Sequence, residues 1–305
     1  MGMETYEIIL DNGTSVFARR PIANEGDDDV KCAGVHARAT SEVNLLQWLE
    51  KARMPTPRII YACSEFYIMS KLPGDVLMNV FGLLSTEKKV CGAHLRLTDR
   101  LPLISYKESL VISYAQTFVE LALLEVPQEI GSTSIGHAPG TLSVVPRAGL
   151  PPFEAADRNF ADIREYFDYL QTGRRIVAYE NCTSDAEKAV IDELLRTLED
   201  YIDVRISKLP DNVLRCALMH NDLNDSNILV DGESGVVTGI IDWELHSIIP
   251  LCLAAEYPRF LRRDGMLDPK YNESNMWWLE SPQESERLMA LFEKVSWIYF
   301  CGALL

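Results

Sequence analysis

The stretch HNDLNDSNILVDGESGVVTGIIDWE, residues 220–244, joins polar residues and apolar strands in a pattern that decides the fold. It begins with His-x-Asp-x-x-x-x-Asn, in which His220, Asp222 and Asn227 are the defined positions. A short apolar strand, the turn GESG and a β-branched strand then lead to Asp242. The fifteen positions from Asn227 to Asp242 (242 − 227) fit strand, turn and strand, so we expect the two side chains to face each other across a hairpin.

Acid, amide and acid in this register predict phosphoryl transfer. That reaction needs an acid to orient the attacking hydroxyl and accept its proton, and ligands for the magnesium ions that neutralise the phosphates. Carboxylate and amide oxygens are the hard ligands that Mg²⁺ prefers. Taken alone, Asp222 is better explained by an Asx turn or a helix cap, and His220 by a hydrogen-bonded place in the core. The joint pattern favours the catalytic interpretation.

Composition limits the classes of function. The 305 residues can form a large core, in one two-lobed unit or in two domains. The net charge of −16 (29 − 45) argues against nucleic acid or an anionic membrane as the main partner, and it is compatible with a cationic small substrate. A hydrolase is disfavoured, because no Gly-x-Ser-x-Gly occurs and only His246 lies near His220 in sequence.

The cysteine pattern and the apolar runs indicate the compartment. The seven cysteines are scattered and form no Cys-x-x-Cys, so we expect reduced thiols rather than a zinc site or a disulfide framework. No basic segment precedes an apolar one at the start, and no apolar run approaches the roughly 20 residues that span a bilayer. A cytoplasmic protein is the expectation.

Local patterns predict a small α/β unit followed by a helical part. The order strand, strand, helix, strand, strand is expected over residues 5–10, 14–21, 40–52, 54–63 and 65–74. The helix is expected to begin at the Thr-Ser pair 40–41. Longer helices are expected over 106–126, 160–180 and 184–209, with a long loop over 127–158 that includes short strands at most. The chain after Trp243 is expected to be mostly helical.

HNDLNDSNILVD together with GIIDWE resembles the aminoglycoside phosphotransferase and choline kinase group, whose fold is related to that of protein kinases. SVFARRP, TSEVNLLQWLEKARMPTPRIIYAC and YIMSKLPGDVL are similar to the strand, helix and interlobe linker of its smaller lobe, and AAEYPRFLR resembles fungal members of uncertain substrate. The resemblance covers nearly the whole chain. It implies a two-lobed, protein-kinase-like α+β fold, with a small N-terminal antiparallel sheet and one helix and a larger, mainly helical C-terminal lobe.

The resemblance also implies an activity and the residues that perform it. The protein would be a small-molecule kinase that uses ATP and Mg²⁺ to move the γ-phosphoryl group to a hydroxyl. Asp222 would be the catalytic acid, with His220 supporting the catalytic loop. Asn227 and Asp242 would hold magnesium.

On the nucleotide side, the resemblance implies a pair between Glu42 and a basic residue of the preceding strand. That residue is a lysine in the protein-kinase pattern and Arg19 here, and arginine bridges phosphate and carboxylate with a different geometry. A solvated arginine on an edge strand is the alternative. The backbone of Ser70 to Leu72 would meet the adenine ring, with Met69 either lining that pocket or packing in the core.

The expected division is a nucleotide-binding lobe over residues 1–72 and a catalytic and substrate lobe over 73–305. In the family, a strand and a glycine-bearing turn that cover the triphosphate precede the segment matching METYEIIL, and here only the first residues stand before it. The first strand is therefore expected to be missing and the activity reduced. This keeps a catalytically impaired, ligand-binding kinase fold as the alternative to an active enzyme.

The acceptor is left open. An amine-bearing acceptor is one option, because Glu244, Glu256, Asp264 and Glu280 would suit it, although solvated helix faces carry the same residues. Trp277 and Trp278 suit stacking on a ring or a cation, or packing at a helix edge. Aminoglycoside, choline-like amine, sugar and fungal metabolite all stay open, and fold resemblance does not imply antibiotic resistance.

Overall fold

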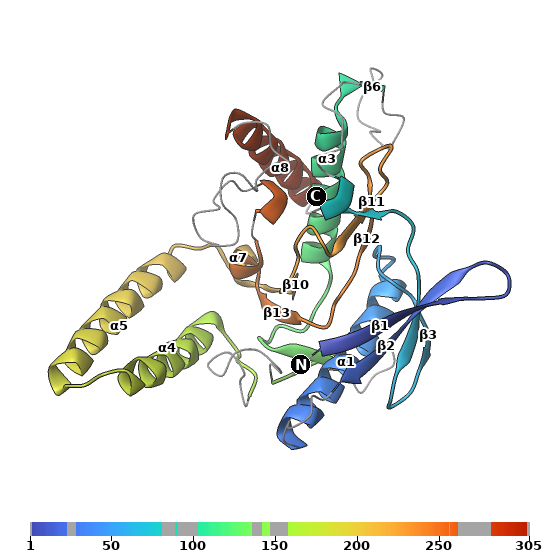
Figure 1. Cartoon of the computed structure of the whole chain (residues 1–305). Helices are drawn as coiled ribbons and strands as arrows, with labels where there is room; N and C mark the ends of the chain where they lie inside the picture. The colour runs from blue at the N-terminus through green and yellow to red at the C-terminus, as the bar shows by residue number, and fades with distance from the viewer. Residues whose placement is uncertain are drawn as a thin grey trace.

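The computed structural model describes residues 2–22, 29–80, 89–90, 103–135, 142–146, 158–255, 257–261 and 282–303. These parts form two lobes, a small sheet with one long helix and a larger lobe built mainly of helices around short strands (Figure 1). The two-lobed α+β fold expected from the sequence is confirmed. No helix within the described ranges is both long and apolar enough to cross a membrane.

The smaller lobe is built on an antiparallel sheet whose strands follow the order β1-β2-β4-β3. The turn between β1 and β2 contains Gly13, whose φ of 80° lies in the left-handed region that glycine adopts without strain. The expected order of strand, strand, helix, strand and strand is confirmed. The elements are β1 (Gly2–Ile9), β2 (Ser15–Ile22), α1 (Asp29–Lys51), β3 (Ile59–Ala62) and β4 (Tyr67–Ser70).

Helix α1 begins eleven residues before the Thr-Ser pair that was expected to start it (40 − 29). The hydroxyl of Thr40 donates to the carbonyl of His36, 3.0 Å away, so this pair lies inside the helix and caps nothing. Val35 and Ala39 are buried before the pair, as Leu45 is after it, and one apolar face therefore continues through it. A Thr-Ser pair alone did not reveal whether it stood at the start of a helix or well inside one.

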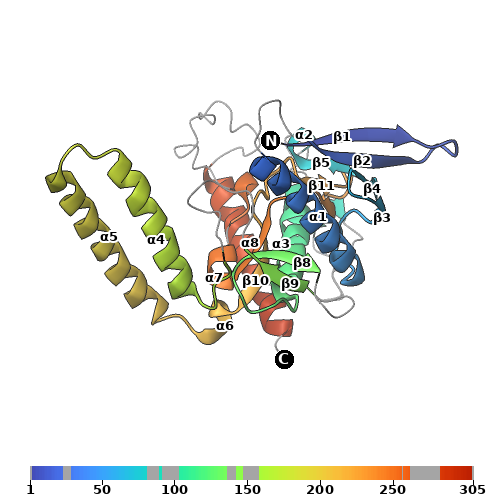
Figure 2. The ribbon, with the colours of Figure 1, turned by 90° about the horizontal axis from the view of Figure 1, so that it is seen from below.

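In the larger lobe, strands of the short sheets pack against α3, and α3 packs in turn against α8. Its longer helices are α3 (Tyr106–Leu123), α4 (Ile163–Glu180), α5 (Asp185–Ile206) and α8 (Pro282–Ala303). Short helices are α2 (Leu77–Val80), α6 (Asp211–Leu214), α7 (Leu251–Ala254) and a 3₁₀ turn (Arg259–Leu261). Helices α4 and α5 form a hairpin that projects from the rest (Figures 1 and 2).

Short strands form several small sheets in the larger lobe. β11 (Ile228–Val230) lies between β12 (Val237–Ile240) and β5 (Asp75–Val76). The hairpin pattern predicts its pairing with β12, whereas its pairing with β5 was not expected. β10 (Cys216–His220) pairs with β13 (His246–Pro250), and β8 (Ser132–Ile135) with β9 (Leu142–Val145). A further pair joins β6 (Lys89–Val90) to β7 (Leu103–Ile104).

The part after Trp243 was expected to be mostly helical, and β13 corrects this expectation at its start. All five residues of β13 are buried. A strand buried on both faces shows no alternation of polar and apolar residues, so its periodicity does not separate it from a short buried helix.

The link between the lobes runs closely against the β11–β12 hairpin. Gly74 has a φ of 102°, and a Cβ there would lie 2.3 Å from Thr238 Oγ1 and 2.7 Å from the carbonyl oxygen of Val230. Only glycine fits this approach. The following strand, β5, then pairs with β11, so the link is joined directly to the hairpin that carries the polar motif.

Candidate active site

The loop after β10 is held by His220. The backbone N–H of Asp222 donates to His220 Nδ1, 3.2 Å away, so the ring proton lies on Nε2 and faces the carbonyl oxygen of Ile241 at 2.9 Å. The ring packs against Trp243 with centroids 4.6 Å apart. Burial lowers the pKa of His220 and keeps the ring neutral. One imidazole thus fixes the loop that carries Asp222 against the end of strand β12.

The carboxylate of Asp222 is oriented by two amides. Asn224 Nδ2 donates to Asp222 Oδ1 at 3.0 Å, and Asn227 Nδ2 donates to the Asp222 carbonyl at 2.8 Å and lies 3.4 Å from Oδ2. An ionised carboxylate fixed in this way can accept a proton from a hydroxyl group. Because the Nδ2 of Asn227 donates to Asp222, its Oδ1 is the atom that could bind a cation.

Asp242 lies beside Asn227 through backbone pairing. The N–H of Ile241 donates to the carbonyl oxygen of Asn227 at 3.0 Å, and Asp242 follows directly. Its φ of 65° is unusual for a residue with a side chain, and such conformations gather at functional sites. The hairpin therefore brings the two expected magnesium ligands together.

Arg19 connects this hairpin to the smaller lobe. Its guanidinium donates to both Glu42 oxygens at 2.7 and 3.0 Å and to Asp242 Oδ1 at 2.7 Å, and it lies 3.6 Å from Glu244. Tyr67 also donates its hydroxyl to Glu42. Arg19 is 6% exposed on β2, an inner strand, so the alternative of a solvated edge arginine is wrong.

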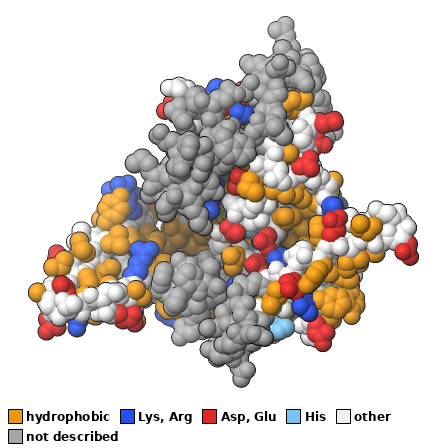
Figure 3. Space-filling model, in the orientation of Figure 1, with side chains coloured by type: hydrophobic (Ala, Val, Ile, Leu, Met, Phe, Trp, Pro, Cys, Tyr) orange, Lys and Arg blue, Asp and Glu red, His pale blue; other side chains and the backbone are white. Residues whose placement is uncertain are grey.

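Burial and charge oppose each other in this cluster. Complete burial raises the pKa of Glu42 to about 7, although Arg19 and Tyr67 favour its charged form. Burial also opposes the charge on Arg19, but the surrounding carboxylates outweigh it and the pKa of Arg19 is raised. Burial and the nearby Asp242 raise the pKa of Glu244. Acidic side chains also mark the junction of the lobes on the face shown in Figure 3.

The expected adenine-binding residues lie where β4 leaves the small sheet. Met69 is buried in the main apolar cluster, so it packs in the core, one of the two roles expected for it. Ser70 accepts a hydrogen bond from the N–H of Arg58 at 2.9 Å. The side chain of Leu72 packs on β12, since its Cδ1 lies 2.4 Å from the position of a Cβ on Gly239.

Several residues of the site were not found from the sequence. His246 is fully buried, with Nδ1 2.6 Å from the carbonyl oxygen of Trp243 and Nε2 2.6 Å from Thr133 Oγ1 and 3.2 Å from Ser41 Oγ. Its partners come from α1 and β8, and no local pattern links them. Glu256, Asp264, Glu280, Trp277 and Trp278, named as candidates for the acceptor site, lie outside the described residues.

The donor set of the site suits Mg²⁺. Asn227 Oδ1 is a neutral oxygen donor, and the carboxylate of Asp242 is a charged one whose Oδ1 already binds Arg19. The side chain of Asp242 is 36% exposed, so it is accessible to a cation from solvent. Proteins usually bind Mg²⁺ through a few oxygen donors of this kind, and water and substrate phosphates supply its remaining ligands.

A model of the phosphotransferase enzyme family (APH) matches residues 4–252. The chain belongs to this family. The Clavilactone A biosynthesis cluster protein Y of Ampulloclitocybe clavipes is a relative, 37% identical over 313 residues that cover 98% of this chain and 72% of the relative. The resemblance to aminoglycoside phosphotransferases and to fungal members of the family is therefore confirmed.

Solved structures show the same family fold. The gentamicin–APH(2")-IIa complex has a TM-score of 0.51 and 13% identity, covering 97% of this chain and 76% of that chain. ADP-bound aminoglycoside phosphotransferase APH(2'')-Ib has a TM-score of 0.51 and 14% identity, covering 99% of this chain and 81% of that chain. At 13% and 14% identity, the likeness to these two structures concerns the fold alone.

His246 makes stability depend on pH. Burial lowers its pKa from 6.5 to about 4, so the folded chain resists protonating it while the unfolded chain does not. As the pH falls through this window, from 6.5 to about 4, protonation of His246 is expected to lower the free energy of unfolding by about 3 kcal/mol. Glu42, with its raised pKa, acts in the opposite direction over part of the window.

The contribution of His246 is measured as a difference. Denaturant unfolding of the native chain and His246→Asn is compared at about pH 7 and about pH 4. The difference in free energy of unfolding between the native chain and the variant should be smaller at about pH 4, because the native chain has then lost the contribution of its neutral His246. The control is His36→Asn, on an exposed part of α1. An equal loss at both pH values would contradict the assignment.

Proposed function

We propose that the protein transfers the γ-phosphoryl group of Mg²⁺-ATP to a hydroxyl of a small molecule. The observation that carries the proposal is the convergence of Asp222, Asn227 and Asp242 on one hairpin, joined to the smaller lobe by Arg19. The family of the chain supports a phosphotransferase. The ADP-bound structural neighbour supports ATP as the donor.

Each part of the site has a distinct task in this proposal. Asp222 orients the acceptor hydroxyl and takes its proton. Asn227 and Asp242 hold Mg²⁺, which when bound neutralises charge on the phosphates. Arg19 sets the position of Asp242 and, with its positive charge, favours phosphate nearby. His220 keeps the catalytic loop in place.

The nucleotide would lie between the lobes. We place the adenine ring against the backbone of Ser70 to Leu72, and we keep residues 1–72 and 73–305 as the division into lobes. The name of the fungal relative, a biosynthesis cluster protein, favours a metabolite as the acceptor. A cytoplasmic location is proposed as well, because the free thiols of Cys63, Cys182, Cys216 and Cys252 suit a reducing compartment.

One observation favours a catalytically impaired, ligand-binding protein instead. Arg19 already binds Asp242 Oδ1 at 2.7 Å, and a cation at Asp242 must compete with this charge for the same carboxylate. The lysine of the kinase pattern carries a single ammonium group, whereas the fork of arginine reaches Glu42 and Asp242 at once.

Calorimetry of ATP binding tests the proposal. The native chain is expected to bind ATP only with Mg²⁺, and Asp242→Ala to lose at least about tenfold in affinity, since even indirect supports of a metal site cost this much. Asp200→Ala, an exposed acid on α5, is the control and should bind as the native chain does. Absence of magnesium-dependent binding in the native chain would favour the impaired protein.

A further inference from the structure

A polar cavity adjoins the catalytic loop on the side of α1. Its volume is about 420 Å³, within the roughly 300–1,000 Å³ of small-molecule sites. It lies where the β8–β9 hairpin packs beside α1 (Figure 2). Asn221, next to the catalytic Asp222, and Glu244, two residues after Asp242, belong to its wall. The cavity therefore borders both halves of the site.

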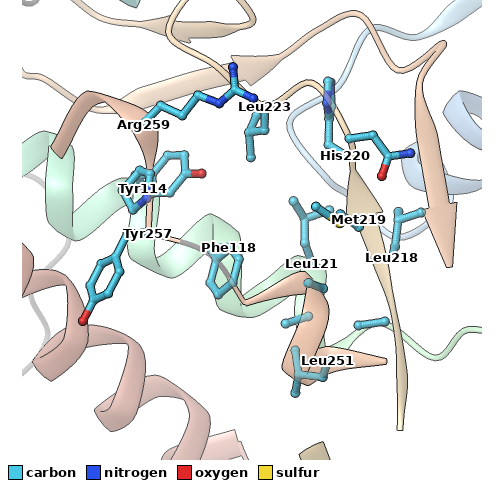
Figure 4. A pocket seen from close by; sticks show the side chains of 15 residues that line it. Tyr114, Phe118, Leu121, Leu218, Met219, His220, Leu223, Leu251, Tyr257 and Arg259 are labelled. Atoms are coloured by element: carbon cyan, nitrogen blue, oxygen red, sulfur yellow. The ribbon is translucent and has the colours of Figure 1, made fainter. Parts of the chain in front are cut away.

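The cavity behind the same loop is unsuitable for a ligand. Its volume is only about 70 Å³, and the side chains around it include Phe118, Leu121 and Leu251 (Figure 4). Room for little more than water, walled largely by apolar groups, does not suit an organic substrate. Of these two cavities beside the catalytic loop, the one of about 420 Å³ has room for an acceptor.

Short hydroxyl and amide side chains dominate the described wall of the larger cavity. Ser41 donates to the carbonyl oxygen of Thr133 at 2.5 Å, and Thr133 holds His246, so one side of the cavity is a fixed network. The other such residues of the wall are Thr40, Asn44, Ser132, Ser134 and Asn221. Groups of this kind exchange hydrogen bonds with hydroxyls.

Two of these amides have unused hydrogen-bonding capacity. Asn44 is 9% exposed, and its side chain forms no hydrogen bond with another described residue. The Nδ2 of Asn221 is buried without a partner among the described residues, although its Oδ1 accepts from Ser247 at 2.9 Å. A buried polar atom without a partner is costly, so a ligand hydroxyl that accepts from the Nδ2 of Asn221 would be favoured here.

The charges at the cavity offset each other. Arg38 and Glu244, one basic and one acidic side chain, both belong to the described wall. One cation beside one anion leaves little net potential to attract a polycation. The wall is therefore better matched to a neutral ligand than to an amine-rich one.

We propose that this cavity binds a neutral polyhydroxylated small molecule and that this molecule is the phosphoryl acceptor. The inference rests on the proposed function, because one hydroxyl must reach Asp222. That hydroxyl gives its proton to the Asp222 carboxylate while its oxygen forms a bond to the γ-phosphorus of ATP. The bond from that phosphorus to the bridging oxygen breaks, and the products are a phosphate monoester and ADP.

The test offers Mg²⁺-ATP together with D-glucose, myo-inositol or sucrose, and with kanamycin as a polycation. Release of ADP and the ³¹P spectrum of the monoester are measured for the native chain, Asn44→Leu and Ser134→Val. At least one neutral polyol is expected to be phosphorylated in preference to kanamycin. Both variants should lower kcat/KM by about tenfold, the value of one net hydrogen bond, with the Kd of Mg²⁺-ATP unchanged.

Asn212→Leu, an exposed amide on α6 outside the wall, is the matched control and should behave as the native chain. A native chain that binds Mg²⁺-ATP but accepts none of the polyols, or prefers kanamycin, overturns the inference and leaves the proposed function standing. Equal effects of Asn44→Leu and Asn212→Leu also overturn it. If Mg²⁺-ATP does not bind, the proposed function fails and the role of acceptor fails with it.

Discussion

Asp222→Asn is expected to lower the rate of phosphoryl transfer by about 10²–10⁴-fold, the range for loss of a positioned general base. Asparagine keeps the size of the side chain but cannot take the proton of the acceptor. The bond from Asn227 Nδ2 to the carbonyl of residue 222, 2.8 Å in the native chain, does not involve the carboxylate and should persist. The loss should therefore fall on kcat, while the Kd of Mg²⁺-ATP changes little.

Acceptor-dependent release of ADP gives kcat and KM for this variant, and calorimetry gives its affinity for Mg²⁺-ATP. Asp200→Asn makes the same chemical change on an exposed part of α5 and should leave all three constants as they are. If Asp222→Asn kept the native kcat, the proton would have to leave through another group, and Asp222 would be reduced to a structural residue of the loop.

The hairpin with Asn227 and Asp242 could be predicted from the sequence because its information is local. Two apolar runs and a turn fix which residues pair, and Ile228 opposite Ile240 is what the pattern implies. The chemistry of the side chains at the ends of the hairpin then indicates their role, since carboxylate and amide oxygens suit Mg²⁺ and a carboxylate can accept a proton. The pairing of Arg19 with Glu42 followed from the family resemblance in the same way.

The rest of the site depends on contacts between distant segments. His246 meets Thr133 across 113 positions and Ser41 across 205, and Tyr67 reaches Glu42 across 25. No periodicity or spacing records such contacts, since they arise only when α1, β8 and β13 pack together. The same holds for the cavity beside Asn221, whose wall comes from both lobes.

The sequence did not reveal that Arg19 binds Glu42 and Asp242 at the same time. A guanidinium group offers two separate terminal nitrogens. Here Nη1 donates to Glu42 on α1, while Nη2 donates to Asp242 after β12. A lysine would offer one ammonium group in this position. The presence of arginine where the kinase pattern has lysine therefore joins strand β2, helix α1 and the β11–β12 hairpin through one buried cation. We expect the stability of this arrangement to depend on Glu42.

Glu42→Leu is accordingly expected to lower the free energy of unfolding by about 3 kcal/mol, the lower end of the range for a broken buried ion pair. Glu42 is 1% exposed and Arg19 6%, so neither charge is compensated by water. The loss stays at the lower end because Asp242 still binds Arg19. Denaturant unfolding should be measured above the pKa of about 7 to which burial raises Glu42, so that the native carboxylate is charged.

Two further variants separate charge from packing. Arg19→Met combined with Glu42→Leu replaces the pair by apolar groups, and it should recover much of the lost stability because neither member of the pair is then left buried without the other. Asp242, which also loses Arg19, is 36% exposed and can be solvated instead. Glu4→Leu removes the partner of Arg20 on the exposed neighbouring pair and should change stability little, since solvent screens that pair. If the double variant were less stable than Glu42→Leu alone, Arg19 would be stabilised mainly by Asp242 and Glu244, and the link between α1 and the hairpin would not depend on Glu42.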